Sequence, residues 1–429
     1  MDAGETTIGD ATTGEAPGRQ DAIDGSPQWQ VTLWAMVAVQ LIMSSAFTFL
    51  SPVLPLFLPH LGVDSLSQVE FWTGLLASMT SFIAAFAAPI WGKMSDRLGR
   101  KLMVLRSAFA IGVCTLLMGF SQNVWHLLAL RALMGAFAGF TSSSVILVAS
   151  QVPERRLGYS LGLLSSGQLV GSLLGPVMGG GLADLTGSYR QPFFVAGAIS
   201  LIAFALCWWL VPERFTPPKE KRKGTTMLAS FRMMTRIPGM APLILVLLLT
   251  QFAVQAIAPI VTLFVQEMVG PQPNLATLGG LAFSVTGLAG VVAVPLLGRA
   301  SDRFGERIVL LLTLAGAALM TVPQAFVGNY WLFVSERFAV GLFVGGILPA
   351  ANALIGKKTP AAERGAIYGM TSSAYFFGNS LGPVTGGAVA ASFGLHWVFL
   401  LTAILLGLNL AWVYFSVHPP ENNQQLEAR

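Results

Sequence analysis

The chain has 429 residues, of which 54% are hydrophobic and only 10% are charged, and its mean hydropathy is +0.67. Soluble globular proteins carry about 25% charged residues, so this composition excludes a soluble particle and favours a protein that is covered mostly by lipid. The formal net charge of +5 comes from basic residues in polar segments between long apolar runs, and we do not interpret it as a nucleic-acid-binding surface.

The first 28 residues are polar, with six acidic side chains and a single basic one, Arg19. A signal peptide would instead begin with a basic stretch followed by a short apolar core. We therefore predict a disordered tail over 1–28, after which the first apolar segment remains in the protein as a membrane span.

Apolar segments long enough to cross a bilayer then recur along the chain. A hydrocarbon core of about 30 Å needs roughly 20 residues of helix, and a helix satisfies its own backbone hydrogen bonds in lipid. We predict an all-α membrane protein of twelve transmembrane helices. The predicted spans are 31–58, 70–92, 102–120, 125–149, 159–183, 192–211, 241–267, 276–298, 307–327, 331–356, 365–391 and 396–417.

The longest polar stretch inside the chain separates the sixth predicted span from the seventh. It predicts a linker between two halves of six helices each, followed by a short tail at the C-terminus. The predicted divisions are 29–212 for the first half, 213–240 for the linker, 241–418 for the second half and 419–429 for the tail.

Basic residues predict the orientation, because they remain on the cytoplasmic side of a membrane. With the N-terminus inside, the cytoplasmic connections hold 20 of the 25 Lys and Arg residues, whereas the opposite face holds only Arg190. Five lie in 93–106, two in 155–156, seven in 214–236, three in 299–307 and three in 357–364. The tails, and with them both termini, are therefore predicted to be cytoplasmic.

Three motifs occur twice in the same order, 206 or 207 residues apart. They are Gly92-Lys-Met-Ser-Asp-Arg-Leu-Gly99 with Gly298-Arg-Ala-Ser-Asp-Arg-Phe-Gly305, Arg131-Ala-Leu-Met-Gly135 with Arg337-Phe-Ala-Val-Gly341, and Gly171-x-x-x-Gly-Pro-x-x-Gly-Gly180 with Gly378-x-x-x-Gly-Pro-x-x-Gly-Gly387. The repeats predict two pseudo-symmetric halves. Transporters built in this way bind substrate between the halves and move one half against the other.

With these motifs the chain resembles the major facilitator superfamily over about residues 30–417. The runs Pro52-Val-Leu-Pro-Leu-Phe-Leu, Leu130-Arg-Ala-Leu-Met-Gly and Ala149-Ser-Gln-Val-Pro resemble bacterial twelve-span drug:proton antiporters. The resemblance implies the major facilitator fold and proton-driven export of amphipathic drugs across the bacterial inner membrane by alternating access. The alternatives are a carrier for a defined metabolite, such as a sugar or lipid, and a membrane sensor that no longer transports.

The expected partners are a small-molecule substrate, protons and the lipid bilayer, and we expect a monomer. We expect neither enzymatic activity nor a cofactor. The sequence has no Gly-x-x-x-x-Gly-Lys-Ser/Thr loop, so ATP is not expected to drive transport directly. The two cysteines, Cys114 and Cys207, fall in predicted spans and are interpreted as apolar core residues, and four scattered histidines predict no metal site.

The loop after the second predicted span carries a dense set of charges. By resemblance it latches the cytoplasmic gate, with Asp96 among basic neighbours or facing a helix N-terminus. The alternative is a basic loop that only sets the topology. The candidate gate residues are Gly92, Asp96, Arg97, Gly99, Arg100, Lys101, Asp302 and Arg303. The second copy has Glu306 where the first has Arg100, so we expect two unequal latches.

The glycine motif of the fifth predicted span places its glycines four residues apart, on one helix face, with a proline that bends the helix. Small residues allow close helix packing, and by resemblance the motif seals the central cavity against proton leak. The candidate residues are Gly171, Gly175, Pro176, Gly179 and Gly180.

Three charged side chains lie within predicted spans and are candidates for proton coupling: Arg131, Glu336 and Arg337. An intramembrane arginine is unfavourable unless it is paired or hydrated, so Arg131 either takes part in proton relay, as the resemblance implies, or extends to the headgroups. Glu336 is the only carboxylate that we place well within a helix. It either carries the proton or forms a static ion pair with Arg131 or Arg337.

Polar and aromatic residues of several spans are candidates for lining a substrate cavity that suits bulky amphipathic compounds. They are Gln40, Ser44, Phe47, Gln251, Phe252, Gln255, Asn352, Tyr375, Phe376 and Asn379. Aromatic residues in membrane helices also face lipid or the core, and that alternative applies to each of them.

Overall fold

The structure, a computed structural model, describes residues 28–213, 239–359 and 364–417. The predicted N-terminal tail, nearly all of the linker and the C-terminal tail lie outside the described residues. The described residues form helices joined by short connections, with no β-strand among them.

Residues 28–213 are called the N half, and their helices run alternately in opposite directions. The elements are α2 (Gln28–Thr48), α3 (Leu54–Phe57), η1 (Leu58–Leu61), α4 (Leu66–Leu98), α5 (Arg100–Gly119), α6 (Val124–Ala136), α7 (Phe140–Ala149), η2 (Glu154–Arg156), α8 (Leu157–Thr186) and α9 (Gln191–Leu210).

Residues 239–417 are called the C half, of which 360–363 are not described. The elements are α11 (Met240–Ile257), η3 (Ala258–Ile260), α12 (Val261–Val269), α13 (Leu275–Phe304), α14 (Glu306–Thr321), η4 (Pro323–Ala325), α15 (Tyr330–Lys358), α16 (Arg364–Phe393) and α17 (Leu395–Ser416).

Eleven segments of the described chain are long and apolar enough to cross a membrane, and each coincides with a predicted span. The remaining predicted span, 365–391, corresponds to α16, which has 30 residues but is not among those eleven. This helix packs closely against α4 and α11 inside the bundle, which agrees with its modest apolar content.

Four predicted spans are not the continuous helices that we expected, including the ninth, where α14 ends at Thr321 before the 3₁₀ turn η4. The first is interrupted after Thr48 and resumes as α3 and η1, and the seventh passes through a 3₁₀ turn, η3, that contains Pro259. The fourth is broken between Ala136 and Phe140, where Gly139 adopts a φ of +119° that favours glycine. Apolar composition predicts where a span lies but not whether its helix is interrupted.

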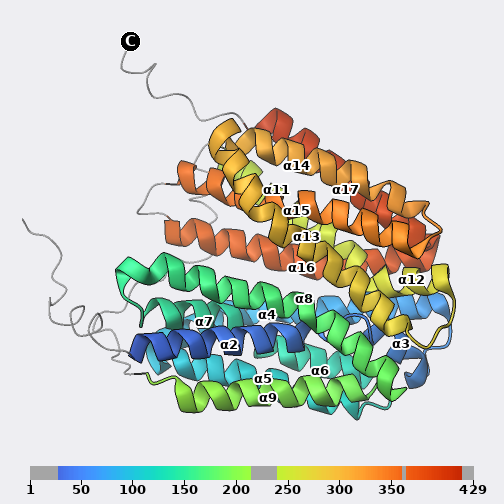
Figure 1. The fold of residues 1–429 in the computed structure, drawn as a ribbon, viewed down its shortest axis with the longest axis horizontal. Helices are drawn as coiled ribbons and strands as arrows, with labels where there is room; N and C mark the ends of the chain where they lie inside the picture. The colour runs from blue at the N-terminus through green and yellow to red at the C-terminus, as the bar shows by residue number, and fades with distance from the viewer. Residues whose placement is uncertain (1–27, 214–238, 360–363, 418–429) are drawn as a thin grey trace, which may run out of the picture.

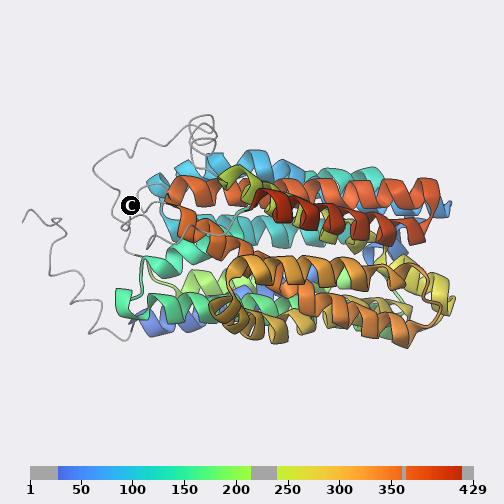
Figure 2. The ribbon, with the colours of Figure 1, turned by 90° about the horizontal axis from the view of Figure 1, so that it is seen from above.

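The halves lie side by side along the length of the bundle (Figures 1 and 2), with α16 packed against α4 and α13 packed against α8. The start of α2 and the end of α17 lie at the same end of the bundle. That end is called the terminal end below. The opposite end, which carries α3 and α12, is called the distal end.

The buried apolar core is continuous between the halves only toward the distal end. One cluster of buried side chains contains residues from all of the N half together with distal C-half residues such as Phe264, Phe333 and Phe399. A second cluster contains the C-half residues nearer the terminal end, such as Leu243 and Leu310. Both cysteines are buried, as expected.

Candidate functional site

The glycine motif of α8 packs against α2 inside the N half. A Cβ atom added at Gly171, Gly175 or Gly179 would overlap backbone oxygen atoms of α2 or of Phe49, which follows it. The three glycines therefore share one face, as predicted, and that face brings two helix backbones into direct contact. Larger side chains would separate the two helices.

The other two residues of the motif face the C half. A Cβ atom at Gly180 would overlap the carbonyl group of Ala276 at the start of α13, and one at Gly280 would overlap the carbonyl group of Pro176. This reciprocal contact places α8 and α13 backbone to backbone at the distal end. The motif thus joins the two halves as well as packing its own half.

The repeated motif makes the matching contact on the other side of the interface. An added Cβ at Gly387 of α16 would lie 2.6 Å from the carbonyl oxygen of Glu70 on α4, and one at Gly74 would overlap the carbonyl oxygen of Pro383. Gly387 and Pro383 follow Gly180 and Pro176 by 207 residues, and Glu70 and Gly74 precede Ala276 and Gly280 by 206. The two contacts are therefore pseudo-symmetric copies of one another.

Asp184, in the last turn of α8, binds the first turn of α13. Its carboxylate accepts hydrogen bonds from the backbone N–H groups of Ala276 (3.2 Å) and Thr277 (2.7 Å) and from the Thr277 hydroxyl (2.5 Å). Free N–H groups and a partial positive charge at a helix N-terminus both favour a carboxylate there. The position 207 residues later is Ala391, so the α16 side has no equivalent carboxylate.

Two further hydrogen bonds connect the halves. The Ser284 hydroxyl of α13 donates to the carbonyl oxygen of Leu173 (2.5 Å), and the backbone N–H of Val384 donates to the Ser78 hydroxyl (2.8 Å). Ser78 and Ser284 are 206 residues apart. Ser78 lies in the distal part of α4, and Ser284 lies in the distal part of α13. Together with the glycine contacts and the shared apolar core, they close the bundle at its distal end.

At the terminal end, the candidate gate loop contains a contact that we did not predict. Glu213, just after α9, accepts hydrogen bonds from the backbone N–H groups of Arg100 (2.8 Å) and Lys101 (2.9 Å) at the start of α5. The carboxylate that binds this helix N-terminus thus comes from the segment that follows the sixth span. The Lys101 ammonium donates to the Trp208 carbonyl oxygen.

Other residues of the first gate motif are more exposed. Gly92 and Arg97 lie on the surface, and Gly99 adopts a φ of +95° at the turn between α4 and α5. The Asp96 side chain lies outside the described part of the structure, so the predicted cluster around it stays a prediction. Glu213 follows an apolar span and precedes the basic part of the linker. This pattern marks the end of the span but does not identify the helix N-terminus that Glu213 binds.

The second gate motif has contacts of its own. Asp302 and Arg303 are exposed, and the Arg303 guanidinium lies over the Phe304 ring at 5.2 Å. Glu306, which replaces Arg100 of the first copy, forms an ion pair with Lys357 at the end of α15. The two terminal-end loops therefore use different residue types at equivalent positions.

The proton-coupling candidates lie within helices of both halves. Arg337 on α15 is 8% exposed, and its Nε donates to the Ala282 carbonyl oxygen at 3.4 Å. On α6 the buried Nε of Arg131 has no hydrogen-bond partner, and neither has the buried Oε2 of Glu336 on α15. Glu336 forms no ion pair with Arg131 or Arg337, so the static ion pair is not what the structure shows.

A second buried carboxylate lies in the first turns of a helix, near the span end where we placed it. Glu70, expected at a span end, is the fifth residue of α4 and is 4% exposed. The helix starts four residues earlier than predicted, at Leu66, with its N-terminus capped by the Ser65 hydroxyl. Hydropathy did not predict this first turn because most of the residues in 65–68 are polar.

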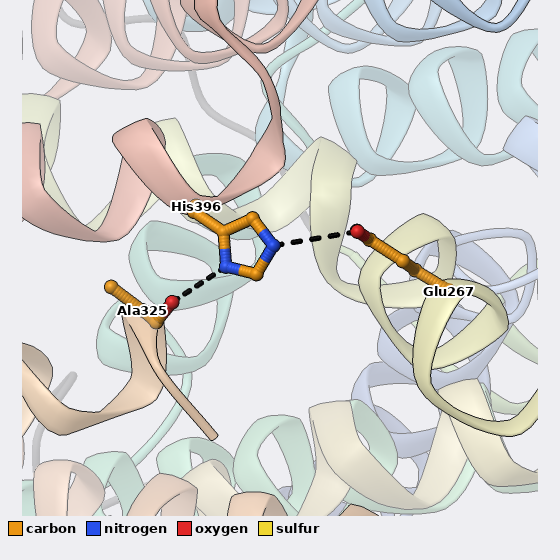
Figure 3. A network of polar contacts seen from close by, with 3 residues as sticks. All are labelled: Glu267, Ala325 and His396. Atoms are coloured by element: carbon orange, nitrogen blue, oxygen red, sulfur yellow. Dashed lines mark hydrogen bonds and ion pairs between the residues drawn. The ribbon is translucent and has the colours of Figure 1, made fainter. Parts of the chain in front are cut away.

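A histidine and a glutamate of the C half lie close to each other at the distal end (Figure 3). His396 Nδ1 contacts the Ala325 carbonyl oxygen at 2.5 Å, and its Nε2 contacts Glu267 Oε1 at 3.4 Å. A carbonyl oxygen only accepts, so Nδ1 carries the hydrogen, and a second donation from Nε2 requires a cationic ring. Both side chains are about half exposed.

The predicted cavity residues are not all in one place. Gln40 is buried, and its Nε2 donates to Gln168 Oε1 of α8 at 3.2 Å. Ser44 faces the same helix at Gly171, whereas Phe47 is 53% exposed. The predicted polar pair of span one therefore packs against α8.

In the C half, the predicted residues divide between α11, α15 and α16. Gln251 and Phe252 contact Gly378 on α16, and Gln255 lines a cavity that also contains Arg337. Asn379 is buried and donates to the Tyr375 carbonyl oxygen at 3.0 Å. The remaining side chains, which are exposed or half-buried, are Asn352, Tyr375 and Phe376.

The break in the fourth span is held by two side chains that sequence analysis missed. Trp91 Nε1 donates to the Ala136 carbonyl oxygen (2.7 Å), and the Arg106 guanidinium donates to those of Phe137 (3.2 Å) and Ala138 (2.9 Å). Arg106 also lies over the Trp91 ring at 3.4 Å. We had counted Arg106 among loop residues, but it lies in the second turn of α5.

Comparison with known proteins agrees with this architecture. The profile of the Major Facilitator Superfamily matches residues 36–278 and 243–429. This chain belongs to the Major Facilitator Superfamily. It is 37% identical over 393 residues to the multidrug resistance protein MdtG of Proteus mirabilis, covering 92% of this chain and 97% of the relative. The MdtG protein of Yersinia enterocolitica is also 37% identical, over 394 residues, covering 91% and 94%.

Solved structures of other transporters share the fold. A bacterial homologue of the human lysosomal transporter Spinster superposes with a TM-score of 0.71 at 16% identity, covering 91% of this chain and 97% of that one. The nucleoside transporter NupG superposes with a TM-score of 0.74 at 13% identity, covering 90% and 100%. At these identities, the likeness concerns the fold alone.

Proposed function

We propose that this chain exports small amphipathic molecules across a bacterial inner membrane in exchange for protons, by alternating access between its two halves. The observation that carries the proposal is the distal closure, in which two pseudo-symmetric glycine contacts and the Asp184 carboxylate join the halves. The relatives named as multidrug resistance proteins support the choice of substrates.

Alternating access requires an interface that separates as a unit. The distal contacts consist of backbone approaches at glycines and five hydrogen bonds, and they involve no ion pair between the halves among the described residues. Such contacts exchange for water and lipid without stranding a buried charge. In the proposed cycle they break when the molecule opens at its distal end.

The proposed orientation has both termini in the cytoplasm, so that the distal end faces outward. The structure then corresponds to the state in which the outer side is closed. In this scheme the glycine motif of α8 and its copy on α16 seal the outer side, and the loops at Gly99 and Gly305 belong to the cytoplasmic gate. The halves 29–212 and 241–418 move as the two bodies of a monomer.

The test is transport by purified protein in liposomes with an imposed pH gradient and a panel of cationic, neutral and anionic amphipathic dyes. Uphill accumulation that depends on the gradient, and that a protonophore abolishes, supports proton-coupled export. Transport of a single sugar or lipid, or transport that is indifferent to the gradient, would refute it. Vesicles without protein provide the control for leak.

A further inference from the structure

A partly enclosed cavity lies inside the C half, with one wall next to α8 of the N half. Its volume is about 210 Å³, and its walls come from α11, η3, α13, α14, α15 and α17. Most of the lining is apolar, and includes Phe283, Val340 and Leu406. One charged group, the guanidinium of Arg337, lines it.

Arg337 has little in the structure to compensate its charge. Its side chain is 92% buried, and its single hydrogen bond is the long one from Nε to the Ala282 carbonyl oxygen. Neither Glu336 nor any other described carboxylate lies within ion-pair distance of it. A guanidinium carries five N–H donors and stays charged, so most of its donors are available to a ligand.

A second unused polar group lines the same cavity. The Thr286 hydroxyl is buried and has no hydrogen-bond partner, whereas the hydroxyls of Thr321 and Thr402 donate to backbone carbonyl oxygens. The Gln255 side chain also lines the cavity. Buried polar groups are nearly always hydrogen-bonded in native proteins, so an arginine and a threonine with unused donors in one cavity indicate a missing acceptor.

The N half shows what the equivalent pair looks like when its threonine is satisfied. Thr80 and Arg131 precede Thr286 and Arg337 by 206 residues. The Thr80 hydroxyl donates to the Arg131 carbonyl oxygen at 3.2 Å. In the C half this bond is absent, and the hydroxyl remains unused. The two copies of the motif therefore differ at the threonine, whose hydroxyl is unused only in the C half, whereas in the N half the buried Nε of Arg131 lacks a partner.

We propose that this cavity is a binding site for an organic carboxylate, held by the Arg337 guanidinium with the Thr286 hydroxyl as a second donor. A planar carboxylate accepts two parallel bonds from a guanidinium, and the apolar walls suit an aromatic or aliphatic body. The volume equals that of roughly seven water molecules at about 30 Å³ each. It therefore accommodates a small carboxylate, or the acidic end of a larger molecule.

The position of the cavity connects it to the interface between the halves. Gly287 lines the cavity, and an added Cβ there would lie 2.6 Å from the Leu173 side chain of α8. Next to it, Ser284 binds the Leu173 carbonyl oxygen. Separation of α8 from α13 would uncover this wall. The site thus extends the proposed export function to molecules that carry a carboxylate, although binding itself does not require that function.

The test measures ligand binding rather than transport, so its failure and that of the proposed function are distinguishable. Calorimetric titration of the full chain in lipid nanodiscs compares benzoate with benzamide, its neutral isostere, and with benzylamine, a cation. We expect benzoate alone to bind. Arg337→Gln should weaken benzoate binding by at least about tenfold, since hydrogen bonds to charged groups are the strong ones.

Thr286→Val removes the second donor at nearly constant volume. This second test does not require Arg337→Gln to fold. It should weaken benzoate binding severalfold, whereas Thr80→Val, the matched change in the N half, should leave it unchanged. Equal affinity for benzoate and benzamide would overturn the proposal, as would unchanged benzoate binding in Thr286→Val. Tight chloride binding without benzoate binding would also overturn it, because the occupant would then be an inorganic anion.

Discussion

Asp184 and Thr277 join the two halves through two hydrogen bonds to one carboxylate, from the Thr277 backbone N–H at 2.7 Å and from its hydroxyl at 2.5 Å. Asp184 lies in the last turn of its own helix, α8. A negative charge there is unfavourable, because the partial charge at a helix C-terminus is also negative. The carboxylate is therefore stabilised by the other half of the molecule, and only while the distal end is closed.

Replacing this carboxylate should shift the balance between the closed and open distal ends. Hydrogen bonds to a charged group contribute about 1.5–3 kcal/mol, so Asp184→Ala should favour the open form by about tenfold or more. Spin labels at Gln68 and Gln272, which are exposed at the distal ends of the two halves, report the distance between them by pulsed electron resonance. We expect a new population at longer distance.

Asp64→Ala is the matched control for that experiment. Asp64 is also an exposed acid at the distal end, but it makes no hydrogen bond or ion pair to a described residue. Its loss changes the net charge by the same amount and should leave the distances unchanged. Identical distance distributions in Asp184→Ala and the parent would show that the carboxylate does not hold the halves together.

Two adjacent glycines of α8 provide a test of the backbone contact between the halves. Gly180→Ala adds a methyl group that overlaps the Ala276 carbonyl, while the same change at Gly181 meets its nearest atom, the Thr277 hydroxyl oxygen, at 4.0 Å. Overpacking typically costs about 1–3 kcal/mol, and here it acts only when the distal end is closed. Transport into liposomes should fall severalfold or more in Gly180→Ala.

Gly181→Ala should transport like the parent, because its methyl group makes an ordinary contact. Equal transport by the two variants would mean that α8 and α13 do not approach as closely as described. Loss of folded protein in Gly180→Ala alone would mean that the contact between α8 and α13 is needed for folding, and size-exclusion chromatography distinguishes this from a specific loss of transport.

The broken fourth span gives a prediction about stability. Arg106→Met removes the donors to the Phe137 and Ala138 carbonyl oxygens but retains an apolar stem of similar length. An unsatisfied buried carbonyl group costs about 1–3 kcal/mol, so the melting temperature in detergent should fall by several degrees. Leu312→Met, the matched position of the C half 206 residues later, should melt like the parent. An unchanged melting temperature in Arg106→Met would contradict the proposed role.

These side chains show what the sequence could and could not predict. The twelve spans, the repeat and the shared face of Gly171, Gly175 and Gly179 follow from hydropathy and spacing, which are properties of the local chain. The acceptor of Trp91 and the partner of Asp184 lie 45 and 92 or more residues away. Such pairings depend on tertiary packing, and a single sequence contains no signal for them.

Two charged residues that pack inside the protein were not recognised as such from the sequence, for a related reason. Arg106 and Glu70 lie near the ends of apolar runs, where we placed Glu70 at a span end and counted Arg106 with the cytoplasmic connection 93–106. In the structure both belong to helices, one stacked on Trp91 and the other buried at the interface between the halves. A charged residue within one or two turns of a span end therefore needs a packing partner before it is assigned to water.

The orientation in the membrane remains a prediction from the distribution of Lys and Arg. Gln272, at the distal end, and Glu154, at the terminal end, are both exposed. Each is replaced by cysteine in a separate variant. In intact cells an impermeant maleimide should label the first and not the second, while both should react after the membrane is permeabilised. The reverse pattern would place the termini outside and invert the proposed direction of every gate.

Proton coupling is tested by two carboxylates that the structure leaves without a hydrogen-bonded or ionic partner among the described residues, Glu336 and Glu70. We predict that Glu336 carries the proton. Glu336→Gln should then abolish uphill, gradient-driven efflux while downhill exchange survives, because the neutral amide mimics the protonated acid. Glu70→Gln should retain coupling, and Asp64→Asn controls for the loss of one exposed acid.

Substrate-induced proton release from the purified variants separates the possible carriers. The expected result is release by the parent, Glu70→Gln and Asp64→Asn, and none by Glu336→Gln. Because Glu336 forms no ion pair with Arg131 or Arg337, its neutralisation strands no partner, and the variant should fold normally. Normal proton release by a well-folded Glu336→Gln variant would exclude Glu336. Loss of release in Glu70→Gln alone would instead assign the proton to the buried acid at the distal interface, where the Glu70 carbonyl meets Gly387 of the other half.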